Sequence, residues 1–177
     1  MVFRAVYARF GKALALVFFI FLFFLFMSRI DFIINSVLYN YGLVFSYNWA
    51  NTYWLTYNFT FVVFSAVAAF VYWLGSPKTS YDKKVVVALL VTINLLALGG
   101  LQDILYFVFW AGGLPVNSVV WWWSQWKGIF GTWNTLLQLE LMFGMVAFSV
   151  LTWGLALHQK KKPARILCNM RVIANAE

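Results

Sequence analysis

Residues 132–157 read TWNTLLQLELMFGMVAFSVLTWGLAL, an apolar stretch that contains one charged side chain, Glu140. An α-helix rises 1.5 Å per residue, so about 20 apolar residues cross a hydrocarbon core about 30 Å thick. In lipid, the backbone amides of a spanning segment must form their hydrogen bonds within that segment. The stretch therefore predicts a membrane-spanning helix.

The same pattern occurs three times earlier in the chain, which gives expected spans at about 13–35, 52–74, 85–112 and 132–157. Four spans joined by short connections predict an all-α fold, an integral membrane four-helix bundle. No change in composition marks a second domain. We therefore expect one transmembrane domain, 1–158, followed by a basic tail, 159–177.

The composition excludes a soluble globular enzyme. Hydrophobic residues make up 64% of the chain and charged residues 10%, whereas about a quarter of an ordinary soluble domain is charged. The single cysteine, Cys168, excludes an internal disulfide framework, and the single histidine, His158, excludes a site built from several histidines. We expect no metal and no cofactor.

The positions of the basic residues predict the topology. Basic residues are enriched in the cytoplasmic loops of membrane proteins. Arg29 and Lys127 fall on one side of the expected spans, and the other basic residues fall on the opposite side: Arg4, Arg9, Lys12, Lys78, Lys83, Lys84, Lys160, Lys161, Lys162, Arg165 and Arg171. Both termini are therefore expected to be cytoplasmic. No aromatic residues alternate with the charges of the tail, so we expect no nucleic-acid partner.

The first apolar stretch has two interpretations. Its basic start and its short apolar core are typical of a cleaved signal peptide. However, no small-residue cleavage site follows, because the chain continues Phe26-Met27-Ser28-Arg29. We favour a helix that is retained.

The two external connections, 32–51 and 113–131, are rich in aromatic residues. Trp and Tyr favour the headgroup zone of a bilayer, so we expect both connections to form half-buried interfacial segments. The three consecutive tryptophans at 121–123 have two interpretations: a belt that sets the depth of the fourth helix, or a platform for a ligand or a partner subunit.

Two acidic residues lie well inside the expected spans, and ionisable groups there are costly and often functional. Asp103 lies about 13 Å below the external end of the third span, and Glu140 lies about 12 Å deep in the fourth. Both carboxyls are thus expected at one level of the outer half of the bilayer. Asp31 is expected near the external end of the first span.

Helical spacing identifies the neighbours of each acid. The residues expected to line a site with Asp103 and Glu140 are Asn58, Gln102, Tyr106, Trp110 and Trp133. Gly99 and Gly144 fall on the faces of the two acids, where a missing side chain would let a helix or ligand approach closely. Gln138 lies about 200° from Glu140 around the fourth helix, so these two side chains cannot serve one narrow site.

Three interpretations of the Asp103 and Glu140 pair remain open. Each carboxyl could hold the bundle together through hydrogen bonds between helices. A desolvated carboxyl could exchange protons, as a general acid and base or in a proton path. The pair could also bind a cationic group of a ligand or of a partner helix, because the two expected spans that carry the acids contain no basic residue to pair with them.

These features predict an accessory or structural subunit of a larger membrane complex. The expected partners are the lipid bilayer and other membrane subunits, or further copies of this chain. The alternative is a membrane-embedded enzyme or binding protein for a lipophilic molecule such as an isoprenoid, a sterol-like compound or a quinone, with Asp103 and Glu140 as its site. The sequence leaves open whether the protein is an enzyme. An ion-coupled carrier is disfavoured, because no chain of polar residues continues through the cytoplasmic half.

Overall fold

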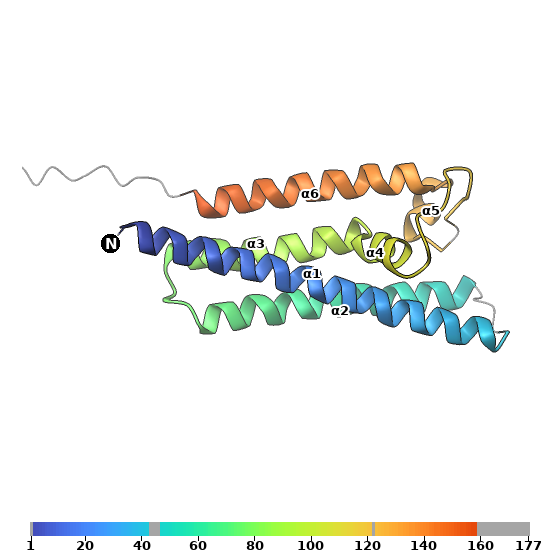
Figure 1. Cartoon of the computed structure of the whole chain (residues 1–177), viewed down its shortest axis with the longest axis horizontal. Coiled ribbons are helices and arrows are strands. Elements are labelled where there is room, and N and C mark those ends of the chain that lie inside the picture. The colour runs from blue at the N-terminus through green and yellow to red at the C-terminus, as the bar shows by residue number, and fades with distance from the viewer. Residues whose placement is uncertain (1, 43–46, 122, 159–177) are drawn as a thin grey trace, which may run out of the picture.

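The computed structural model describes residues 2–42, 47–121 and 123–158, and the regular structure in these ranges is helical. In chain order the helices are α1 (Val2–Asn40), α2 (Tyr47–Leu74), α3 (Ser80–Leu98), α4 (Leu101–Phe109), α5 (Gln125–Phe130) and α6 (Thr135–Leu157). Figure 1 shows the four longest helices running alongside one another, with α4 and α5 gathered at one end. We call this end the α5 end.

Three of the helices, α1, α2 and α6, are long and apolar enough to cross a membrane. The pair α3 and α4 also passes this test when taken together, although the two helices are bent by 58° relative to each other. The chain is therefore an all-helical protein with three or four candidate membrane spans. α3 packs between α2 and α6, while α1 packs on α4.

Aromatic rings join α1 to α2. Phe24 of α1 is fully buried and stacks on Phe61 of α2, with ring centroids 4.7 Å apart. One position earlier, Phe23 stacks on Phe64 with centroids 3.5 Å apart. Lipid tails are as apolar as these rings, so the contact depends on close packing more than on exclusion of water.

The first helix extends beyond its expected span of 13–35 at both ends, from Val2 to Asn40. No proline interrupts this segment, and a helix started in lipid continues until the chain reaches a breaker. The start of the expected interfacial segment 32–51 therefore belongs to α1, and α2 begins within that segment at Tyr47. The second segment, 113–131, contains the short helix α5.

The third helix starts before the expected position, 85, because a capping box sets its beginning at Ser80. The Thr79 hydroxyl accepts a hydrogen bond from the Asp82 amide at 3.4 Å, and the Asp82 carboxyl accepts one from the Thr79 amide at 2.8 Å. Such a reciprocal pair satisfies two amides that the first turn of a helix leaves free. The charged residues 82–84 are thus part of the helix.

The third expected span, 85–112, is not one straight helix, because it breaks at Gly99 and Gly100. Gly100 has φ +72°, a left-handed conformation that favours glycine. The chain bends by 58° at this point and continues as α4. A helical face drawn through the span 85–112 by 3.6-residue periodicity is therefore divided between two helices.

Replacement of Gly100 by alanine should destabilise the fold. A Cβ at this position would lie 2.2 Å from Gln138 Nε2, and its backbone would be held at positive φ. We expect a loss of about 2 kcal/mol or more, measured as a lower melting temperature of the purified protein in detergent. Gly154→Ala is the matched control, since a Cβ there meets no atom within 4 Å. Equal melting temperatures for the two variants would contradict this account of the bend.

Candidate functional site

A buried polar cluster lies where α1, α2 and α4 meet, and its centre is the carboxyl of Asp31. Three side chains donate hydrogen bonds to this carboxyl: the Tyr53 hydroxyl of α2, Asn35 Nδ2 of α1 at 3.1 Å, and Gln102 Nε2 of α4 at 3.4 Å. Asp31 itself is 6% exposed. The donors come from three helices, so this one carboxyl joins them.

A second carboxyl, Asp103, lies in the first turn of α4 and interacts electrostatically with Asp31. Asp103 is 9% exposed, and it accepts no hydrogen bond from any residue that the structure describes. Gly100, at the N-terminal cap of α4, carries no side chain that could cap the helix. The partial positive charge of that helix end is favourable for a negative charge on Asp103.

Tyrosine hydroxyls complete the cluster. Tyr57 is 7% exposed, and its hydroxyl interacts with Tyr53 and Gln102, although neither contact has normal hydrogen-bond geometry. Tyr57 and Tyr106 both interact electrostatically with Asp31 and Asp103. The cluster thus holds two acids, three tyrosines and the amide side chains of Asn35 and Gln102.

Two side chains satisfy the backbone carbonyls that the bend sets free. Gln138 of α6 donates from Nε2 to the Gly99 carbonyl at 2.6 Å, and Trp126 of α5 donates from Nε1 to the Leu98 carbonyl at 3.0 Å. Trp133 donates in turn to Gln138 Oε1 at 2.7 Å. A break inside a membrane helix needs partners of this kind. These bonds fix the direction of α4 and hence the position of Asp103.

Glu140 does not join the cluster. Gln138 is bonded to Gly99, and Glu140 follows two residues later, so Glu140 lies within about 3 Å of this level along α6. Its side chain is exposed, however, while Gln138 is 1% exposed. The two expected acids thus lie at similar levels but on different sides of the protein.

The other expected site residues divide into two groups. Gln102 and Tyr106 lie in the cluster with Asp103. Asn58 donates instead to Gln125 of α5 at 3.1 Å, and Trp110 donates to Ser28 of α1 at 3.0 Å. Trp133 holds Gln138 at the bend. These last three side chains join helices or segments and do not line the site around Asp103.

The tryptophans of the second aromatic segment pack inward. Trp121 is fully buried, stacks on Trp123 with centroids 5.5 Å apart, and donates from its indole to Thr135 at 3.0 Å. Trp123 also accepts a hydrogen bond from Trp54 on its carbonyl at 2.5 Å. This segment is therefore bound to α2 and α6 by specific contacts. Trp122 lies outside the described residues.

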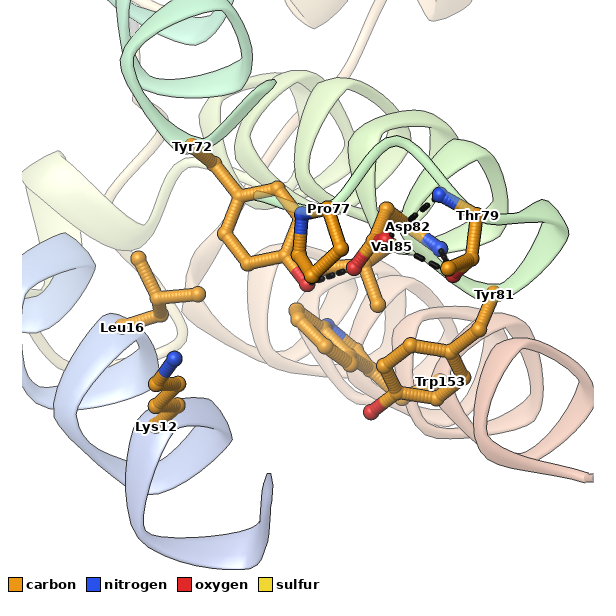
Figure 2. A pocket seen from close by; sticks show the side chains of 9 residues that line it. All are labelled: Lys12, Leu16, Tyr72, Pro77, Thr79, Tyr81, Asp82, Val85 and Trp153. Carbon is orange, nitrogen blue, oxygen red and sulfur yellow. Dashed lines mark hydrogen bonds between the residues drawn. The ribbon is translucent and has the colours of Figure 1, made fainter. Parts of the chain in front are cut away.

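A cavity of about 140 Å³ lies at the opposite end of the protein from α5. Figure 2 shows Lys12 and Leu16 of α1 on one side of it and Tyr72, Pro77 and Trp153 on the other. Its acid, Asp82, accepts hydrogen bonds from Thr79 and Tyr72. Because the Asp82 carboxyl is already hydrogen-bonded at the start of α3, we do not take this cavity as the candidate site.

Asp31 is the site residue that sequence reasoning missed. With the first span ending at 35, Asp31 is placed near the membrane surface. Because α1 continues to Asn40, Asp31 lies about 14 Å from the end of the helix, as deep as the position expected for Asp103. One signal was present in the sequence: Asn35 follows Asp31 by one helical turn, which is the spacing of a hydrogen-bonded pair.

The chain was compared with protein-family models, with curated proteins and with solved structures, and none of them matches it. The geometry of the described residues therefore carries the functional argument.

Replacement of Gln138 by methionine should destabilise the fold while keeping the side-chain volume. The variant leaves the Gly99 carbonyl and the Trp133 indole without partners in a buried region, at a cost of about 1–3 kcal/mol for each group. The measurement is again thermal melting in detergent. Glu140→Gln, two residues away on the exposed side, should melt like the natural protein. A melting temperature unchanged by Gln138→Met would show that the bend does not depend on these bonds.

Proposed function

We propose that this protein is a subunit of a larger membrane complex, with four spans, cytoplasmic termini and a partner helix packed on α6. The observation that carries the proposal is the exposure of Glu140 on a helix suited to span a membrane. Acidic residues inside spans almost always face a protein interior or water. A second protein that covers Glu140 would keep its carboxyl out of contact with lipid.

The surroundings of Glu140 suit a helix partner. Gly144 lies one turn further along α6, and a Cβ added there would meet no atom within 4 Å. Ala147 follows on the same face and is also exposed. Small residues let two helix backbones approach closely in a membrane. The partner helix should carry a hydrogen-bond donor at this depth, such as a lysine, an arginine or an amide side chain, to meet the carboxyl.

The arrangement of the ends supports the proposed topology. Figure 1 shows the N-terminal end of α1 and the C-terminal end of α6 at the same end of the protein. That is the arrangement expected from four crossings with both termini in the cytoplasm. In the proposed orientation the basic residues Lys78, Lys83 and Lys84 also lie on the cytoplasmic side, as the positive-inside rule requires.

Purification from native membranes in mild detergent tests the subunit proposal. We expect the natural chain to migrate as a complex, and Glu140→Leu to lose at least about 10-fold of the partner, because the partner's polar group is then buried unpaired. Phe59→Leu, on the exposed face of α2, is the control and should retain the partner. A monodisperse, partner-free natural protein would contradict the proposal.

The second candidate is a membrane-embedded enzyme or binding protein for a lipophilic ligand. It is favoured by the cluster of Asp103, Gln102 and Tyr106, in which Asp31 takes the place that the sequence assigned to Glu140.

A photoreactive isoprenoid analogue tests this candidate. Asp103→Asn should reduce labelling of the purified protein at least about 10-fold, since a buried polar contact is lost, whereas Glu140→Gln should leave labelling unchanged. Equal labelling of both variants would exclude the cluster as the ligand site.

A further inference from the structure

We propose that Asp31 and Asp103 together form a proton-binding site that holds one exchangeable proton, and that this proton resides on Asp103. The site is separate from the Glu140 face, and the proposal stands whether or not α6 has a partner. Its ligand is H⁺, taken from and returned to water.

The first argument is the unequal supply of hydrogen-bond donors. Asp31 accepts from Tyr53, Asn35 and Gln102, and three donors favour the ionised form of a carboxyl. Asp103 accepts from no described residue. A carboxyl buried without donors is far less costly when neutral. Two interacting acids in such different surroundings are expected to divide a single proton unequally.

The second argument is the absence of a compensating cation among the residues described. From α1, Asp31 faces the site, and Arg29 is exposed with its guanidinium over the rings of Phe32 and Trp110. The titratable groups contributed by the other elements are Tyr53 and Tyr57 of α2 and Asp103 and Tyr106 of α4. Two negative charges would thus be buried together without a positive partner, and one proton removes one of them.

The third argument is the unsatisfied hydroxyl of Tyr57. This group is nine-tenths buried, interacts with both acids, and meets its neighbours Tyr53 and Gln102 without a hydrogen bond of normal geometry. Buried hydroxyls are normally paired. Because this hydroxyl is held only weakly by Tyr53 and Gln102, it can turn toward the Asp103 carboxyl when the proton of that carboxyl leaves. The Tyr57 hydroxyl is therefore compatible with the ionised form of Asp103 as well as with its protonated form.

Labelling with dicyclohexylcarbodiimide tests the proposal. This apolar reagent takes the proton of a neutral carboxyl onto its nitrogen, and the carboxyl oxygen then bonds to its central carbon. Acyl transfer to nitrogen gives a stable acylurea, whereas an ionised carboxyl does not react. The full-length chain in detergent is labelled across a pH series and mapped by mass spectrometry, in a Glu140→Gln background that removes the exposed acid of α6.

We expect labelling at Asp103 that falls as the pH rises, and no labelling of Asp31. Asp31→Asn removes the neighbouring negative charge, so the pH of half-labelling should fall by about one unit or more. Tyr57→Phe removes the donor for the ionised form, so the same pH should rise. Tyr72→Phe, at the other end of α2, is the matched control and should not shift it.

The pH of half-labelling should therefore move in opposite directions in Asp31→Asn and Tyr57→Phe. A cluster with a merely structural role would not show this pair of opposite changes. Melting temperatures identify a variant that fails to fold. If Asp31→Asn fails to fold, Tyr57→Phe still tests the proposal. The proposal is overturned if folded protein shows no label at Asp103 at any pH. It is also overturned if sodium chloride, compared with choline chloride at one pH, protects Asp103, because the bound cation would then be a metal ion.

Discussion

The interior of this protein depends on how two backbone carbonyls are satisfied where its third apolar helix breaks. In the proposed topology the Leu98 and Gly99 carbonyls lie in the bilayer, where water is not available to pair with them, so side chains must do so. Trp126 and Gln138 supply these bonds from α5 and α6. Because both donors are fixed, α4 leaves the bend in a defined direction, and Asp103 in its first turn is brought to the polar cluster around Asp31.

Besides Asp82, which caps α3, the three acids of the helices occupy three different electrostatic environments. Asp31 is surrounded by donors, Asp103 is buried without any among the described residues, and Glu140 is exposed on α6. The cost of a negative charge is lowered differently in each case. Hydrogen bonds lower it for Asp31, whereas our proposals assign a bound proton to Asp103 and a partner outside this chain to Glu140. The two proposals thus assign a binding role and an assembly role to the same chemical group that in Asp31 joins three helices.

The sequence predicted the all-helical membrane architecture well, because lipid imposes helix formation on any long apolar stretch. Periodicity also placed Gln138 and Glu140 on different sides of one helix, as the structure has them. The composition of the buried cluster could not be predicted in the same way. Its geometry depends on the left-handed conformation of Gly100, and a straight helix drawn through that residue directs Asp103 differently. The depth of Asp31 depended likewise on where α1 ends, which apolar composition alone does not determine.

The hydrogen bond from Trp126 to Leu98 means that a connecting segment helps to hold the bend between α3 and α4. α5 lies in a connection that would ordinarily tolerate insertions and substitutions. Here the indole of Trp126 pairs with the carbonyl of Leu98, the last residue of α3. This connection is therefore less free to change in length or sequence than an ordinary loop, and an affinity tag or protease site placed there would disturb the bend between α3 and α4.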